Sequence, residues 1–395
     1  MNKKAQQQQT TTLSNEGDLT MTRALPTRQR IHRAATDKNR ETITLAPELG
    51  IKKPEIPIVG IDLGTLFNKD AYLYSNEIAY VEKVENFLSE VENQPRSNLK
   101  KGSFSQRNRR SPKSDLVINY CGKSYALGKQ GIISGGNTNL DGDKTDEIEV
   151  IPRVLIALTL YDLGKKPGEK IHLSIAIPFE SESKFEKKEA KIRSAINSNL
   201  TWGTADGARE VEIVTLKVDP EDYHAELFSR LYAVDSPNFE DKDRVTLGIG
   251  FRTFNLGVIA DDGYYDSVRS KSFDGKGTSL FYEWIASEIG LKDWNNAQFI
   301  HAVNSGADTF RPQGTDEELE IKEAVKLARG WYIAELVKIV KKYTPSEIEC
   351  FVICGGGGLM VGEELMKNLW GEIIICPESD IANSLGQVIE VAMEL

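Results

Sequence analysis

The stretch that decides the fold is Ile56-Pro-Ile-Val-Gly-Ile-Asp-Leu-Gly-Thr-Leu-Phe-Asn-Lys69. Its apolar first half predicts a short β-strand, which runs into the polar turn Asp62-Leu-Gly64-Thr65. Apolar runs at 71–74 and 77–81 follow at the spacing of a hairpin. The sequence therefore predicts a meander of three strands, with a glycine-containing turn after the first.

A second strand, turn and strand follow about 185 residues later, at Gly248-Ile-Gly250-Phe-Arg-Thr253-Phe-Asn255. Further on, an apolar strand at 348–354 runs into the glycines Gly355 to Gly358, and a helical pattern opens at Leu359. A strand, a glycine turn and a helix start together form a ready-made anion or nucleotide site, because the helix N-terminus offers free backbone N–H groups. The same glycines would also allow a strand and a helix to approach closely without any ligand.

The rest of the chain alternates between the periods of helices and of strands. The segment Thr315-Asp-Glu-Glu318 matches the Ser/Thr-x-x-Glu capping box, which predicts a long helix from Thr315 to about Lys342. Further helices are expected at 148–160, 183–196 and 222–231, and strands at 172–179, 211–218 and 244–259. This pattern is typical of a mixed α/β protein.

The composition excludes several classes of protein. The 395 residues include 49 basic and 59 acidic ones, a formal net charge of −10. No segment approaches the roughly 18 to 20 uncharged apolar residues of a membrane-spanning helix, and the N-terminus lacks an apolar signal segment. Four scattered histidines without metal-ligand spacing argue against a histidine-based metal enzyme. We therefore expect a cytoplasmic protein.

Two segments stand apart from the folded pattern. Residues 1–50 are rich in Gln, Thr, Asn and Arg, and eight basic and five acidic residues give them a net charge of +3. Because they lack apolar periodicity, they are predicted to form a disordered tail. The second segment, 96–113, is basic and poor in apolar residues. It is predicted to be an exposed loop, either a solvated insertion or a contact for DNA phosphates or an acidic partner.

The order of these segments resembles the actin, Hsp70 and hexokinase superfamily, and within it the bacterial actin-like proteins of the ParM and StbA type, over residues 56–395. The resemblance implies an α/β, two-domain actin-like fold with a nucleotide cleft between the domains and a disordered N-terminal tail. It implies a first domain at 51–225, to which 376–395 returns, and a second domain at 226–375. The segment 377–386 matches the second connection between the domains.

The resemblance also assigns the residues of the cleft. It implies that Asp62 holds a hydrated Mg²⁺ and contributes, with the phosphate hairpins and the adenosine loop, to binding ATP or GTP. The other nucleotide-binding residues implied are Gly64, Thr65, Asn68, Lys69, Gly250, Thr253, Gly355, Gly356, Gly357 and Gly358. From the residues alone, Lys69 is either a partner for phosphate charge or a surface lysine at the start of a strand.

Glu221 follows Pro220 at the end of a predicted strand and matches the family's Pro-Glu pair. The resemblance implies a catalytic role in which Glu221 orients the attacking water, a positioning on which phosphoryl transfer depends. A second interpretation stays open. Pro220 would then start a helix, and Glu221 and Asp222 would complement the helix dipole.

The second hairpin departs from the family pattern Asp-x-Gly-Gly-x-Thr-x-Asp. Gly248 stands where the first Asp belongs, Phe251 replaces a glycine, and Asn255 replaces the last Asp. Because Mg²⁺ is usually carried by one or two carboxylates together with phosphates and waters, this loss predicts slow hydrolysis or altered metal use. Restoring the carboxylate at position 248 is expected to accelerate hydrolysis if its loss is limiting.

The resemblance therefore implies an actin-like ATPase that polymerises with bound nucleotide. The resemblance implies homopolymeric filaments, an adaptor protein bound to DNA, and a use in DNA or plasmid segregation or as a cell-shape cytoskeleton. Contacts of the tail and of the 96–113 loop with anionic surfaces are a further expectation. Two alternatives stay open, because a fold does not fix a function. They are a nucleotide-binding scaffold that does not hydrolyse, and a monomeric kinase of a small metabolite.

Overall fold

The computed structural model describes most of the chain. The described residues are 32–37, 40–45, 49–64, 67–75, 78–85, 88–91, 117–127, 146–204, 206–233, 242–292, 294–295 and 297–395. Residues 1–31 of the predicted tail, the whole 96–113 segment and the predicted site residue Thr65 lie outside them.

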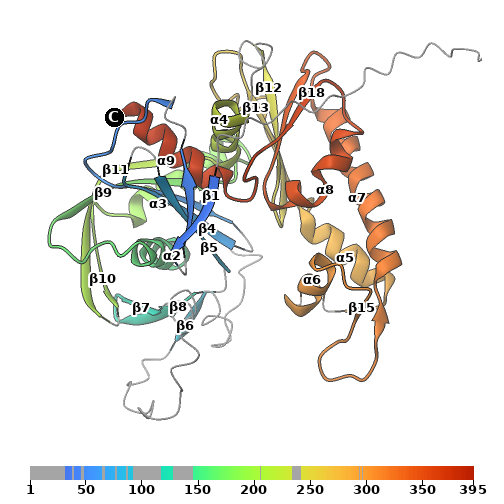
Figure 1. The fold of residues 1–395 in the computed structure, drawn as a ribbon, viewed down its shortest axis with the longest axis horizontal. Coiled ribbons are helices and arrows are strands. Elements are labelled where there is room, and N and C mark those ends of the chain that lie inside the picture. Colours follow the sequence, from blue (N-terminus) through green and yellow to red (C-terminus); the bar gives the residue numbers. More distant parts are fainter. Residues whose placement is uncertain are drawn as a thin grey trace, which may run out of the picture.

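The first half of the molecule is built on a large mixed sheet (Figure 1). At its centre, β3 (Ile58–Leu63), β4 (Phe67–Leu73) and β5 (Ile78–Glu85) form the antiparallel meander that the sequence predicts. On the other side of β3, β9 (Glu169–Ile177) and β11 (Gly207–Pro220) continue the sheet in parallel. Beyond them come, in this order, β10 (Asn199–Thr204), β7 (Val117–Tyr120), β8 (Lys123–Ala126) and β6 (Ser89–Val91).

The opposite edge of this sheet corrects the predicted extent of the tail. There β1 (His32–Asp37) pairs with β2 (Arg40–Thr44), and β2 pairs with β5. Ile43 and Leu45 are fully buried. A tail reaching residue 50 is therefore wrong for its last part, because the alternation around Ile43 places both apolar side chains on one face of a strand. The polar composition of the whole segment hid this short pattern.

The second half is built on a smaller sheet, with β12 (Arg244–Ile249) and β13 (Thr253–Ile259) as the second predicted hairpin. Parallel to β12 runs β17 (Cys350–Cys354), and the edge strands are β14 (Lys271–Asp274) and β18 (Glu372–Ile375). The helices that share a core with this sheet are α5 (Thr278–Glu288), α6 (Ala297–Asn304), α7 (Lys322–Tyr343) and α8 (Gly356–Met366).

Two helices join the two halves. While α2 (Glu147–Leu160) and α3 (Glu182–Ala195) pack on the first sheet alone, α4 (Glu221–Ala233) and α9 (Ala382–Glu394) lie between the sheets (Figure 1). One apolar cluster combines residues of both sheets and of both helices: Ile58, Leu73, Val352, Ile374, Phe228 and Leu385. The halves therefore share a core, and the domain boundary predicted at residue 225 falls inside α4.

The long helix predicted from Thr315 starts later than its capping box suggests. The segment before it forms a small hairpin of β15 (Thr309–Phe310) and β16 (Leu319–Glu320), and α7 begins at Lys322. Thr315 Oγ1 donates to the Pro312 carbonyl at 3.1 Å within this hairpin. Strand pairing thus overrides the local helix signal. Within the described residues, no helix combines the length and apolar character needed to cross a membrane.

The crossing of α4 and α9 is close because Gly386 has no side chain. A Cβ atom there would overlap the His224 carbonyl oxygen and lie 2.7 Å from the carbonyl carbon. Beside this contact, His224 Nε2 lies 3.1 Å and Lys217 Nζ lies 3.2 Å from Glu390 Oε2. Burial opposes ionisation of Glu390, but the hydrogen bonds and charges of His224 and Lys217 outweigh it and lower its pKa to about 2.

Replacing Glu390 with Gln is expected to make the stability less dependent on acid pH. Since the folded-state pKa lies below the ordinary value of 4.5, the ionised carboxylate stabilises the fold above that pH, and this contribution is lost as the pH falls toward the folded-state value. A lowering of this size corresponds to roughly 3 kcal/mol. Urea unfolding between about pH 6 and about pH 3 measures the effect. The wild type should lose more unfolding free energy than Glu390→Gln, and parallel profiles would contradict the account.

Candidate functional site

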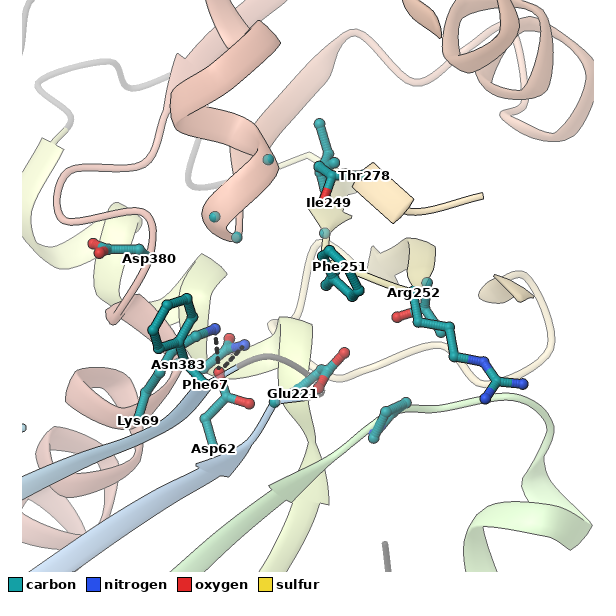
Figure 2. Close-up of a pocket in the computed structure, with 18 of the residues that line it drawn as sticks. Asp62, Phe67, Lys69, Glu221, Ile249, Phe251, Arg252, Thr278, Asp380 and Asn383 are labelled. Carbon is teal, nitrogen blue, oxygen red and sulfur yellow. Dashed lines mark hydrogen bonds and ion pairs between the residues drawn. The ribbon is translucent and has the colours of Figure 1, made fainter. Parts of the chain in front are cut away.

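A cavity of about 1100 Å³ lies between the two sheets and is lined from both of them. Figure 2 shows Asp62 and Lys69 from the first sheet facing Ile249 and Phe251 from the second, with Glu221 between them. The parallel strands β3, β9, β12 and β17 all end at this cavity, which is where open α/β sheets bind their ligands.

Helix N-termini also converge on the cavity. Lining residues include Glu221 and Thr278, the first residues of α4 and α5, Gly356, the first residue of α8, and Asn383 in the first turn of α9. Each helix N-terminus carries a partial positive charge, because the peptide dipoles of the helix are aligned. The cavity is therefore suited to a ligand with several negative charges, such as a chain of phosphates.

The first hairpin delivers Asp62, Gly64 and Lys69 to the cavity, as predicted. The side chain of Asp62 is 2% exposed, and its Oδ2 accepts from Lys69 Nζ at 3.0 Å and from Asn383 Nδ2 at 3.4 Å. Burial opposes the charge of Lys69, but the charge and hydrogen bond of Asp62, with the charges of Glu221 and Asp380, raise its pKa. Lys69 is thus a charged residue of the cavity.

Asn68 does not line the cavity, in contrast to its predicted role. Successive residues of β4 point to opposite faces of the sheet, so Phe67 and Lys69 reach the cavity while Asn68 faces away. Asn68 is fully buried, and its Nδ2 donates to Asp70 Oδ1 at 2.8 Å. Asn68 thus contacts Asp70 of the same strand, on the face of the sheet that points away from the cavity.

In the second hairpin, Gly250 and Thr253 both line the cavity, as predicted. Gly250 N donates to the Thr253 carbonyl at 2.9 Å, which closes a tight turn. The Gly250 carbonyl accepts from Thr278 N at 2.9 Å, which ties this turn to the start of α5.

The predicted glycine run is divided between ligand space and packing. Gly355, Gly356 and Gly357 line the cavity, whereas Gly358 does not. Gly355 has φ +83°, and a Cβ atom there would lie 2.5 Å from the Ile249 carbonyl oxygen. At Gly358 a Cβ atom would lie 2.8 Å from Ser379 Oγ. The run therefore serves both interpretations of the sequence. Gly355, Gly356 and Gly357 open α8 onto the cavity, and the close approach to β12 requires glycine at 355 and 357.

The N-terminus of α4 brings two carboxylates to the cavity, and the sequence assigned a catalytic role to the first alone. Glu221 Oε1 accepts from Asn255 Nδ2 at 2.9 Å, and Asn255 Oδ1 accepts from Ser272 Oγ at 2.6 Å. Asp222 is 5% exposed and also lines the cavity. Burial, with the charges of Glu221 and Asp62, raises the pKa of Asp222 well above its usual range. In the sequence, the position of Asp222 next to Glu221 could have indicated a site residue. The sequence assigned Asp222 only a helix-dipole role.

Gly248 lines the cavity as well, directly against Asp222. A Cβ atom at position 248 would overlap Asp222 Oδ1 and lie 2.6 Å from Asp222 Cγ. An Asp at 248 would therefore have to displace the Asp222 carboxylate, which already fills this space.

The residues fit a hydrated Mg²⁺. Asp62, Glu221 and Asp222 all line the cavity and supply carboxylate oxygens, the ligands that Mg²⁺ prefers. The Lys69 ammonium on Asp62 marks a place where a positive charge is stabilised. When bound with a nucleotide, the ion would neutralise phosphate charge.

The remaining basic residues of the cavity wall are held by acidic partners. Lys83 pairs with Asp380 at 3.0 Å, Arg252 with Asp274 at 2.6 Å, and Lys184 with Glu180 at 2.8 Å. An anionic ligand would compete with these acids for the same cations. At the end formed by α5 to α8, the cavity wall is rich in apolar and aromatic residues, as a nucleotide base requires. They are Phe281, Tyr282, Val303, Val325, Leu359 and Met360.

No family model matches the chain, and no curated protein matches it in sequence. Solved actin-like structures do match. A 15-stranded ParM filament from Clostridium botulinum aligns with a TM-score of 0.65 and 16% identity, over 87% of this chain and 100% of that chain. The archaeal actin homologue Ta0583 aligns with a TM-score of 0.65 and 17% identity, over 86% and 100%. Its complex with ADP aligns with a TM-score of 0.61 and 16% identity, over 86% and 100%. These similarities confirm the predicted α/β actin-like fold.

Gly355→Ala is expected to destabilise the protein by about 1–3 kcal/mol, because Ala disfavours a positive φ and its Cβ would press on the Ile249 carbonyl. Gly356→Ala is the matched control, since no atom lies within 4 Å of a Cβ there. It should be neutral or stabilising by up to about 1 kcal/mol. Urea unfolding of both variants checks this, and equal midpoints would refute the strained-turn account.

Proposed function

We propose that this protein is a nucleotide-dependent filament protein, which binds ATP or GTP with Mg²⁺ in the cavity between its sheets and hydrolyses the nucleotide. One observation carries the proposal. Two hairpin turns and several helix N-termini, drawn from both halves of the chain, face a single cavity whose wall holds carboxylates for a cation. A ligand bound there touches both halves, so its presence and its hydrolysis would bias their relative position.

In the proposed complex the phosphates lie between the two hairpins. The hydroxyl of Thr253 would donate to phosphate oxygens, and Lys69 would shift from Asp62 toward them. Asp62 is released to hold the hydrated cation. The ribose and base extend past Gly355–Gly357 toward the apolar end of the cavity.

Glu221 is proposed to orient the attacking water. Its carboxylate lines the cavity from the interdomain side and is held by Asn255, which is itself fixed by Ser272. A restrained carboxylate is what positioning a water for in-line attack requires. The helix-dipole role at the start of α4 is compatible with this one, since both need the negative charge at the same place.

The proposed use is DNA or plasmid segregation in the cytoplasm, with the filament attached to DNA through an adaptor protein. Support comes from the fold shared with a ParM filament and with actin homologues. The basic 96–113 segment and residues 1–31, both outside the described structure, would add contacts to anionic surfaces.

Assembly is expected to show a critical concentration. Pure protein, sedimented and imaged by electron microscopy across a range of concentrations, should form filaments above a threshold with ATP or GTP and Mg²⁺. Below that threshold, and without nucleotide, it should stay in the supernatant. Nucleotide binding without assembly at any concentration would rule out the filament role and favour the kinase or scaffold alternative.

Glu221→Gln is expected to slow phosphate release by about 100-fold or more, because the amide keeps the volume but lacks the charge that orients water. Filaments should still form with nucleoside triphosphate and should last longer. Glu283→Gln, on the exposed side of α5, is the matched control. Phosphate release and filament lifetime are measured on the same samples. Release at the wild-type rate would remove Glu221 from the mechanism.

A further inference from the structure

Gly248 and Asp222 occupy complementary space at the cavity wall. A Cβ atom at 248 would overlap Asp222 Oδ1 and lie 2.6 Å from Cγ and 2.9 Å from Oδ2. Real Cβ atoms essentially never approach other heavy atoms this closely. The Asp222 carboxylate therefore lies where the side chain of residue 248 would begin, and residue 248 must be glycine for Asp222 to stay there.

The cross-strand neighbour of Gly248 repeats this arrangement. Asn255 pairs with Gly248 across the β12–β13 ladder, and its amide donates to Glu221. The hairpin thus presents a glycine to Asp222, and the Asn255 amide hydrogen-bonds both carboxylates of α4. Acidic residues at 248 and 255 would instead set like charges against Asp222 and Glu221, which is unfavourable at this degree of burial. The neutral hairpin and the acidic helix start are matched to each other.

Helix capping alone does not account for Asp222. A carboxylate in the first turn of a helix gains up to about 2 kcal/mol from the dipole, whereas burial of an ionised carboxylate costs several kcal/mol. Asp222 is 5% exposed and lines the cavity with Glu221 and Asp62. Keeping three carboxylates ionised around one buried space is costly unless cations offset their charge, and Lys69, on Asp62, supplies one such charge.

We propose that Asp222 supplies the second carboxylate of the nucleotide-bound cation, in the place of the carboxylate missing from the β12–β13 hairpin, and that Gly248 is the cradle that admits it. This inference rests on the proposed nucleotide function and deepens it. Asp62 approaches the cation from the first sheet and Asp222 from α4. Asp222 is then a metal-positioning residue of the site. Its carboxylate comes from helix α4, whereas the family pattern places one on the strand that corresponds to β12.

The test is the effect of Mg²⁺ on nucleotide affinity. The protein is titrated into a fluorescent ADP analogue, once with Mg²⁺ present and once with EDTA. The dissociation constant in EDTA divided by the one with Mg²⁺ is the Mg²⁺ ratio, which measures the contribution of the ion. Asp222→Asn should lower this ratio by about tenfold. Gly248→Ala keeps every carboxylate but displaces Asp222, and it should lower the ratio too. Glu288→Gln, exposed on α5, is the control and should keep the wild-type ratio.

A double variant returns the carboxylate to the hairpin. Asp222→Gly combined with Gly248→Asp removes the overlap and places an acidic side chain on β12. It should recover more of the Mg²⁺ effect than Asp222→Gly alone. Paramagnetic resonance of Mn²⁺ with ADP gives a direct second readout of ion binding in the same variants.

The thermal midpoint in EDTA separates a metal role from a structural one. Asp222→Asn should leave the midpoint unchanged or raise it, because it removes the repulsion between the buried Asp222 carboxylate and those of Glu221 and Asp62. A lowered midpoint together with an unchanged Mg²⁺ ratio would overturn the inference. A wild-type Mg²⁺ ratio in both Asp222→Asn and Gly248→Ala would also overturn the inference. The proposed nucleotide function would then remain without a role for Asp222. Absence of nucleotide binding by the wild type would overturn the proposed function first.

Discussion

The packing of α4 against α9 between the two sheets is the contact on which the rest of the molecule depends. Gly386 lets the helices cross with the backbone of α4 almost touching α9. The shared apolar cluster then holds residues from both sheets in one core. Because α4 starts at Glu221 and α9 starts at Ala382, the same crossing fixes where their first turns open onto the cavity. The site and the joint between the halves are thus parts of one arrangement.

Electrostatics at the cavity balances two opposing demands. Helix N-termini and lysines favour an anion, while Asp62, Glu221 and Asp222 favour a cation. In the chain alone these charges partly satisfy one another, as in the contact of Lys69 with Asp62. A nucleotide with its cation would bring both charges at once, replacing internal pairs by contacts with the ligand. We therefore expect the protein to be less stable when this cavity is empty than when it holds the nucleotide and cation, which is typical of functional sites.

Local signals in the sequence predicted the elements that carry the site. The turn at Asp62, the hairpin around Gly250 and the glycines after Cys354 all lie where strand and turn patterns put them. Failures have a common cause, because they depend on tertiary neighbours. Thr315 lies in a small hairpin, Asn68 faces away from the cavity, and Ile43 adds a strand to a segment of polar composition.

The relation between Gly248 and Asp222 was also beyond the sequence. The two residues lie apart in the chain. In the sequence, Gly248 stands as the place of a missing family carboxylate and Asp222 as a helix-dipole carboxylate. Only their overlap in space shows that they are matched. A departure from a family motif therefore need not mean a lost function, because a neighbouring element can hold the group that the motif lacks.

Hydrogen exchange of the wild-type protein, with and without ATP and Mg²⁺, tests the central claim most directly. The account predicts protection in four separate segments at once: the turn after β3, the start of α4, the β12–β13 turn and the start of α8. These come from both halves of the chain, so a ligand between the sheets is the simplest cause of joint protection. Protection confined to one half, or none at saturating nucleotide, would contradict a nucleotide site in this cavity.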